Sequence, residues 1–319
     1  MMTTLKAGLA MAAALTLLTA APALAASVLA APRAPVELRT TSPQGNVMAG
    51  EVILPDGPGP HPVVLLISGT GRQSRDFESF DGRYHPHRDL TNALLAQNIG
   101  VVRFDERNTG ASTGDHRTAR SADLKNDAAS ILDAAKAVPG VGKIFIFGHS
   151  EGAVFAQQLA VERDDIAGIV VAGAPAKSGR EMMRDQVPVE TPRAPGMSDA
   201  DFAKAVEAAY AKEIAFQMTR PSLADLLDLD ALGLAREVKV PALIVEAAED
   251  WQVRPPQGEM LAKAMREGGG KDVTYRRLAD VGHLLTPNPP GVTDYARLTD
   301  YAVAPSVLET VTTWVAARR

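Results

Sequence analysis

The chain of 319 residues contains no cysteine, few aromatic residues and no excess of positive charge. The absence of cysteine excludes disulfide bonds and the lipid-modified cysteine of a lipoprotein. The net charge is −5 and lysine and arginine form no basic stripe, so nucleic acid is not an expected partner. The hydrophobic share of 46% and the charged share of 22% are ordinary for a soluble globular protein.

Residues 1–25 differ in composition from the rest of the chain. Lys6 gives a positive start, residues 7–21 form an apolar run, and small residues then precede Ala26. This order is typical of a secretory signal peptide cleaved just before or just after Ala26. An uncleaved membrane anchor is less favoured, because the apolar run is short for a bilayer span. We therefore expect a mature domain over 26–319, periplasmic or secreted and without stable membrane insertion.

Apolar runs alternate with helical patterns along the mature chain. The expected strands are a hairpin over 36–40 and 47–54, followed by 63–67, 101–104, 143–147, 166–172, 240–246 and 273–278. Helical spacing occurs around 90–94, 124–135, 153–161, 260–265 and 307–315. Strand–helix alternation predicts an α/β fold, with a mostly parallel sheet and helices on both faces.

Residues 177–236 interrupt this alternation, because they lie between two expected strands and contribute none. The segment begins as a loop rich in proline, Pro188 among them, and then becomes helical over 199–218 and 223–234. An insertion placed over the carboxyl ends of the strands would cover a site at that edge. We therefore expect a helical cap within the domain.

The pentapeptide Gly148-His149-Ser150-Glu151-Gly152 stands between an expected strand and an expected helix. In this setting a G-x-S-x-G sequence forms a sharp turn that exposes the serine hydroxyl at the helix N-terminus. Ser150 is therefore the predicted nucleophile. The Glu151 N–H is a predicted oxyanion donor, supported by the helix dipole.

A serine nucleophile needs a base and a carboxylate that orients the base, in the chain order Ser, acid, His. Asp250 follows the strand that ends near 246, and His283 follows the strand that ends near 278. Both would reach the same edge of the sheet as Ser150. His283 is the predicted base and Asp250 the predicted acid. Glu249 is the alternative acid.

The second oxyanion donor is expected in Ser68-Gly69-Thr70-Gly71, directly after a buried strand. Its small residues allow the backbone to approach a substrate closely. The Thr70 N–H is the first choice and the Gly71 N–H the alternative. The stretch is only a weak match to a dinucleotide-binding motif, because Ser74 occupies the third glycine position.

Other histidines provide weaker signals. His149 adjoins Ser150 in sequence, but its side chain is expected to point away, in a structural role. His85 and His87 form an H-x-H pair, yet two loop histidines without further ligands are usually solvated. We expect no metal site.

Together these motifs resemble those of the α/β-hydrolase superfamily, across essentially the whole mature sequence. The resemblance is to a bacterial branch of esterases and dienelactone-hydrolase-like or S9-peptidase-like proteins. It is carried by Ser68-Gly69-Thr70-Gly71, Arg75-Asp76, Arg103-Phe104-Asp105-Glu106-Arg107, Gly110-x-Ser112 and the Ser150 pentapeptide. It implies the α/β-hydrolase fold, with eight mostly parallel strands and a cap after the sixth. Asn108, Thr109 and Ala153 depart from residues common in relatives, which bears on the pocket and leaves the predicted triad intact.

The type of nucleophile limits which reactions of this superfamily the chain can catalyse. The absence of cysteine and the presence of Ser150 exclude the branches with cysteine or aspartate nucleophiles. We expect hydrolysis of a small-molecule carboxylic ester through an acyl-enzyme, without a cofactor. One alternative is a single-domain peptidase, with Glu151, Asp105 or Glu106 holding a substrate amine. Another is a non-catalytic binding protein on this scaffold. The sequence carries no signal for an oligomeric state.

Overall fold

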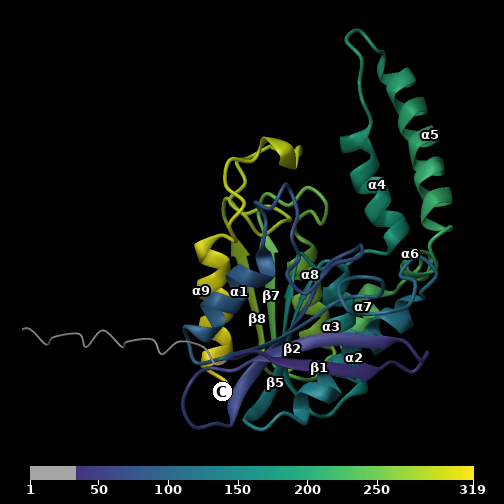
Figure 1. Cartoon of the computed structure of the whole chain (residues 1–319). Coiled ribbons are helices and arrows are strands. Elements are labelled where there is room, and N and C mark those ends of the chain that lie inside the picture. The colour runs from purple at the N-terminus through teal and green to yellow at the C-terminus, as the bar shows by residue number, and fades with distance from the viewer. Residues whose placement is uncertain (1–33) are drawn as a thin grey trace, which may run out of the picture.

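The computed structural model describes residues 34–319, which form one eight-stranded sheet (Figure 1). Its strand order is β1-β2-β4-β3-β5-β6-β7-β8. The strands are β1 (Val36–Thr41), β2 (Val47–Ile53), β3 (His61–Ile67), β4 (Gly100–Phe104), β5 (Val141–His149), β6 (Ile166–Ala172), β7 (Ala242–Ala247) and β8 (Val273–Leu278). β2 runs antiparallel to β1 and β4, and all pairs from β4 to β8 are parallel. The predicted mostly parallel sheet is therefore confirmed.

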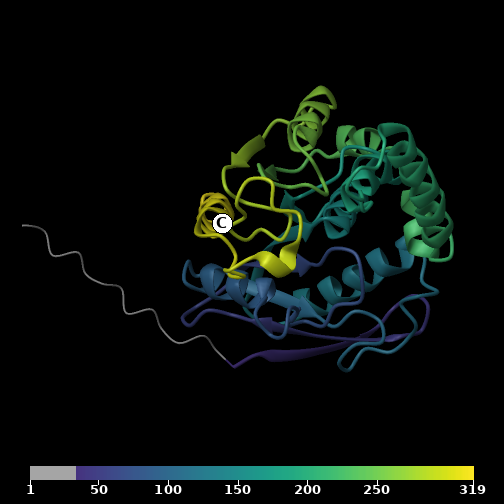
Figure 2. The same cartoon turned by 90° about the horizontal axis from the view of Figure 1, so that it is seen from above.

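Helices cover both faces of the sheet, as the view from above shows (Figure 2). α1 (Pro86–Leu95) and α9 (Pro305–Ala316) share one buried apolar cluster. α2 (Ser121–Lys136), α3 (Glu151–Glu162), α7 (Ala231–Glu237) and α8 (Gln257–Glu267) share the other. Because helices bury both faces, the central strands are apolar almost without interruption.

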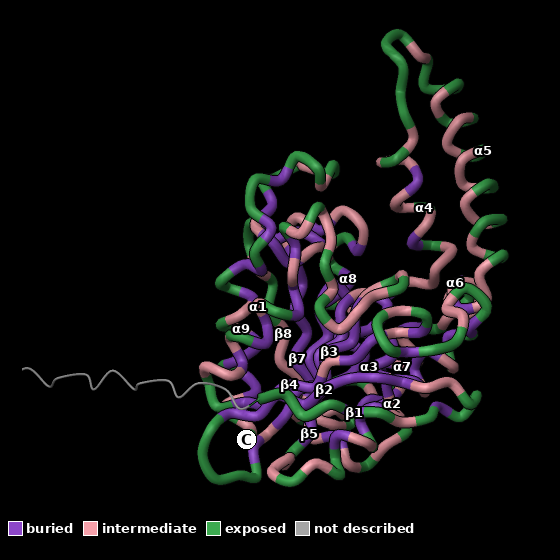
Figure 3. The backbone as a smooth tube through the Cα atoms, in the orientation of Figure 1, coloured by how far each residue is buried: buried purple, intermediate pink, exposed green. Residues whose placement is uncertain are grey.

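The insertion between β6 and β7 consists of helices, of which α4 (Gly179–Glu190) and α5 (Asp199–Gln217) project from the body (Figure 1). Figure 3 shows that this pair is largely exposed or half-buried, and α5 buries no residue. α5 matches the helix expected over 199–218. The lower part of the insertion continues through α6 (Pro221–Leu226) to α7.

Two expectations for the insertion were wrong. The expected proline-rich loop is in part the helix α4, which Ser178 begins with a reciprocal capping box to Glu181. Pro188 lies in the last turn of this helix, where it donates no backbone N–H. The single helix expected over 223–234 is two helices, and Asp230 caps the second by accepting from the Gly233 N–H at 2.8 Å.

The signal-peptide prediction concerns residues that lie outside the described part of the chain. Among residues 34–319, none of the helices is both long enough and apolar enough to span a bilayer.

Candidate active site

Ser150 occupies the turn from β5 into α3 and is the residue that precedes the first turn of the helix. Its backbone has a φ of +54°, in the left-handed region that non-glycine residues rarely adopt, and its N–H donates to the Ala172 carbonyl at 3.0 Å. Gly152 packs so tightly that a Cβ there would lie 2.3 Å from the Ser68 oxygen. The turn is therefore the strained strand-to-helix turn that the sequence predicts.

Asp250 and His283 come together at the same edge of the sheet. His283 Nδ1 lies 2.7 Å from Asp250 Oδ2, and both side chains are buried. The other carboxylate oxygen, Oδ1, accepts from the N–H groups of Gln252 and Val253 at 2.9 and 2.8 Å. These bonds fix the carboxylate, so that His283 is held with Nε2 as its free ring nitrogen.

Glu249, the alternative acid, makes no hydrogen bond to His283 in the described structure. Its backbone N–H donates to the Val281 carbonyl, and its side chain lines a separate, open cavity with Trp251 and Arg254. The geometry therefore favours Asp250 as the partner of the imidazole.

The structure brings His283 next to the turn that carries Ser150. Ser150 is bonded to Ala172 at the end of β6, and a Cβ at the next residue, Gly173, would lie 3.3 Å from His283 Nδ1. Sequence reasoning missed Gly173, whose position directly after the expected strand was the available signal.

His149 links the two loops directly. Its Nε2 lies 2.7 Å from the His283 carbonyl oxygen, and the two rings are 4.9 Å apart. Burial, together with the nearby His283, lowers the pKa of His149 to about 3, so the ring is neutral and its Nε2–H donates. The predicted structural role thus takes a specific form, which is to hold the backbone of His283.

The loop after β3 lies against Ser150. A Cβ at Gly69 would lie 3.0 Å from the Ser150 Cβ, so that a larger residue would crowd Ser150. Thr70 lines one cavity with Ser150 and Glu151, and Gly71 lines the adjoining cavity with Glu151. Thr70 and Glu151 therefore border the cavity that contains Ser150, whereas Gly71, of these two cavities, borders only the adjoining one.

His87 corrects the expectation of two solvated loop histidines, because it is buried behind this loop. Its Nε2 is 3.3 Å from the Ser68 hydroxyl and its Nδ1 3.2 Å from the Arg75 carbonyl oxygen. Burial lowers the pKa of His87 to about 4, which keeps the ring neutral. His85 bonds instead to the Gly82 carbonyl oxygen at 2.6 Å. The described residues contain no group of three or more His, Asp or Glu side chains arranged to hold a metal ion.

Three carboxylates near the site were predicted to be able to hold an amine. In the structure they differ in their hydrogen-bond partners. Asp105 accepts from the backbone and guanidinium of Arg75, at 2.9 and 3.0 Å. Glu106 accepts from the Gln73 N–H at 2.9 Å. Glu151 differs, because it is buried and its Oε1 has no hydrogen-bond partner. Burial raises the pKa of Glu151 to about 7, opposed in part by the neighbouring Thr70 side chain.

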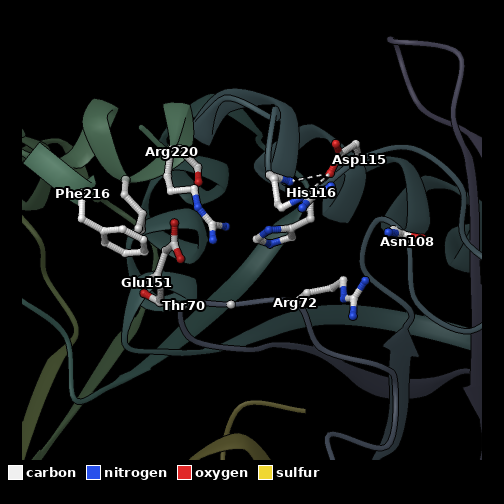
Figure 4. A pocket seen from close by; sticks show the side chains of 12 residues that line it. Thr70, Arg72, Asn108, Asp115, His116, Glu151, Phe216 and Arg220 are labelled. Carbon is white, nitrogen blue, oxygen red and sulfur yellow. Dashed lines mark hydrogen bonds and ion pairs between the residues drawn. The ribbon is translucent and has the colours of Figure 1, made fainter. Parts of the chain in front are cut away.

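Two adjoining cavities lie at this edge. The first, of about 250 Å³, contains Ser150 and is closed on one side by the insertion, through residues such as Met182, Gln217 and Leu223. The second, of about 580 Å³, is drawn in Figure 4. It shares Thr70, Glu151 and Leu223 with the first. Volumes of this size suit small-molecule ligands.

Comparison with known proteins gives a match to a protein family and a match to a relative in sequence. Residues 64–294 match the family described as the alpha/beta hydrolase family. Esterase EstD of Thermotoga maritima is 24% identical over 275 residues, which are 85% of this chain but 66% of EstD, just under two thirds of its length.

Solved structures share the fold at low identity. The Pyrococcus furiosus esterase Pf2001 superposes with a TM-score of 0.59 and 15% identity, covering 89% of each chain. The acylaminoacyl peptidase of Pyrococcus horikoshii superposes with a TM-score of 0.52 and is 16% identical in sequence. The match covers 78% of this chain and 37% of the peptidase. An esterase and a peptidase thus share this fold. With the family match over most of the chain and the eight-stranded sheet in place, the protein belongs to the alpha/beta hydrolase family.

Proposed function

We propose that this protein is an exported serine hydrolase that cleaves carboxylic esters through Ser150, His283 and Asp250. The observation that carries the proposal is the buried 2.7 Å bond between His283 Nδ1 and Asp250 Oδ2, placed beside the strained turn of Ser150. A nucleophile, a base and an oriented carboxylate at one sheet edge are what acyl transfer requires. The esterase EstD supports the choice of reaction, as a relative over most of this chain.

The proposed reaction begins when Ser150 Oγ attacks the ester carbonyl carbon and its proton passes to His283 Nε2. Asp250 stabilises the resulting imidazolium. The N–H groups of Glu151 and Thr70 donate to the oxyanion of the tetrahedral intermediate. Its collapse breaks the C–O bond, and His283 returns the proton to the leaving alcohol. Water then attacks the acyl-enzyme by the same steps and releases the acid.

An ester is favoured over a peptide because none of the three carboxylates considered as partners of a substrate amine is well placed for that role. Asp105 and Glu106 are already engaged by Arg75 and Gln73. Glu151 faces a cavity that is lined by arginines. The shared fold does not separate the two activities, so substrate tests are needed.

Export is proposed from residues 1–25 alone. The test is N-terminal sequencing of the protein recovered from the periplasm or medium of a bacterial host. A mature start at Ala26 or Ser27 supports export, whereas an intact Met1 on protein found only in the cytoplasm contradicts it.

Activity is tested with short-chain 4-nitrophenyl esters and with aminoacyl-4-nitroanilides. We expect ester turnover, slower anilide turnover, and a loss of kcat in Ser150→Ala of about 10⁴-fold or more. Faster anilide turnover would identify a peptidase instead. An absence of turnover on both, with an unreactive Ser150, would leave the non-catalytic binding protein.

A further inference from the structure

The larger of the two cavities is a chamber beside Ser150 that the proposed chemistry does not use. It is lined by four separate parts of the chain: the loop of Thr70, the segment 108–117, Glu151, and the segment 216–223 of the insertion. Ser150 is absent from its lining, but Thr70, Glu151 and Leu223 border both cavities. The chamber therefore adjoins the cavity in which a substrate would meet Ser150.

The chamber holds more positive than negative charge. Arg72, Arg117 and Arg220 line it, and Arg117 is paired with Asp115 at 3.6 Å. The guanidinium groups of Arg72 and Arg220 have no ion pair or hydrogen bond among the described residues. Figure 4 shows the Arg220 guanidinium and the His116 ring pointing into one space, with Glu151 on one side and Arg72 on the other.

His116 reports the positive potential of this space. Its pKa is lowered by burial and further by the charges of Arg220 and Arg72, so the imidazole is neutral at neutral pH. Its Nε2 lies 3.5 Å from Glu106. The ring thus offers a polar group to a ligand without adding a charge.

Glu151 supplies an independent indication of a ligand, since its buried Oε1 lacks a partner at the wall of the chamber. With its pKa raised to about 7, the carboxyl group carries a proton in mildly acidic solution and is then a hydrogen-bond donor. A donor carboxyl group beside unpaired guanidinium groups is complementary to an anion and not to an amine.

We propose that this chamber binds a carboxylate of the substrate through Arg220 and Arg72, so that the enzyme prefers esters that carry a free carboxylate. The inference rests on the proposed esterase function and names its substrate class. The carboxylate comes from either the acyl or the alcohol part of the ester. Arginine suits the role because its planar fork matches a carboxylate with two parallel hydrogen bonds.

The test compares matched pairs of esters. For the acyl part, mono-4-nitrophenyl glutarate is compared with the neutral 4-nitrophenyl glutaramate. For the alcohol part, the acetate ester of 3-hydroxypropanoate is compared with that of 3-hydroxypropanamide. We expect kcat/KM for the anionic member of one pair to be higher by about tenfold or more, equivalent to about 1.4 kcal/mol. Equal turnover within each pair, by an enzyme that hydrolyses the neutral esters, would overturn the inference and leave the esterase function intact.

Variants locate the effect. Arg220→Gln is expected to lower kcat/KM for the preferred anionic ester by about tenfold, mainly through KM, and to leave the neutral ester within about twofold. Arg72→Gln has a smaller effect in the same direction, since Arg72 is exposed. Lys212→Gln is the matched control, because it removes a positive charge from α5 at a residue that faces a different cavity.

Two outcomes of these variants contradict the inference. An equal loss for both members of the pair in Arg220→Gln would show a merely structural role. If Lys212→Gln lost the preference for the anionic ester to the same extent as Arg220→Gln, the preference would reflect the overall charge of the protein and not a specific site. If wild-type enzyme hydrolyses neither ester and Ser150 is unreactive, the proposed function fails first and the inference falls with it.

Discussion

The sheet edge that carries the proposed triad, here called the strand side, and the insertion that lines the Ser150 cavity are built differently. On the strand side, Asp250, His283 and His149 are buried and joined by hydrogen bonds of 2.7 to 2.9 Å, including the backbone bonds to Asp250. On the other side, residues of α4, α5 and α6 line the cavity. α4 buries two residues and α5 none.

This difference assigns the two sides to different tasks. Groups that move protons must be held within a fraction of an ångström. At the sheet edge, hydrogen bonds and burial fix the positions of these side chains. The insertion carries no group of the proposed triad and contributes Met, Leu, Gln and Arg side chains that shape the cavities. We therefore expect substitutions on the strand side to change kcat, and substitutions in the insertion to change KM and substrate preference.

The largest effect is expected from the acid. Asp250→Asn replaces the acceptor of the His283 Nδ1–H by an amide that favours the wrong tautomer, and we expect kcat to fall by about 10³- to 10⁴-fold. Glu249→Gln is the matched control and should stay within about threefold of wild type. The kcat of each variant is measured by steady-state kinetics on a neutral 4-nitrophenyl ester. If Glu249→Gln loses activity and Asp250→Asn keeps it, the assignment of the acid is wrong.

An intermediate effect is expected from His149. His149→Phe keeps a ring but leaves the buried His283 carbonyl without its donor, and we expect kcat to fall by about 10- to 100-fold with KM nearly unchanged. His61→Phe is the control, because His61 also bonds to a backbone carbonyl but lies at the start of β3. Similar Tm losses with a loss of kcat only in His149→Phe would support the role. Equal kcat in both variants would contradict it.

The last effect concerns the stability of the fold, and not its activity, and involves Glu151. The pKa of Glu151 is raised to about 7 in the fold, so the native state binds this proton more tightly than the unfolded chain does. The stabilisation is complete below about pH 4.5 and is lost as pH rises through about 7. Glu151→Gln lacks this titration, whereas the nearby Glu106 titrates in both proteins. We expect the variant to gain about 2 to 3 kcal/mol over wild type between pH 5 and 8, by urea unfolding. Parallel pH curves would show that Glu151 is not protonated in the fold.

Much of the strand side could be predicted from the sequence. Buried strands are recognised by continuous apolar runs, and Ser150 and Asp250 each follow such a run. The strand before His283, β8, instead contains two exposed arginines. What no short window contains is a contact between distant segments. The bond from His149 to the His283 carbonyl joins positions 134 residues apart, and the burial of His87 depends on Ser68 and Arg75 packing around it.

The insertion was harder to predict for a related reason. Its helices bury little surface, so their apolar periodicity is weak. Because Pro188 is typical of a loop, α4 was not predicted, although Ser178 and Glu181 form a capping box at its start. The arginine-lined chamber depends on Arg220, Arg72 and Glu151 lining one cavity, and only the tertiary fold brings these residues to it. The proposed selectivity thus depends on contacts between distant segments, whereas the proposed catalytic residues lie in short sequence motifs.

The central claim is that Ser150 is the nucleophile, and it is tested most directly by locating a covalent label. The protein is treated with a fluorophosphonate, digested with trypsin and analysed by mass spectrometry. The account predicts one phosphonyl group on Ser150, within the tryptic peptide 144–163, in wild type and none in Ser150→Ala. A label on another residue, or none on a folded protein that hydrolyses esters, would contradict it.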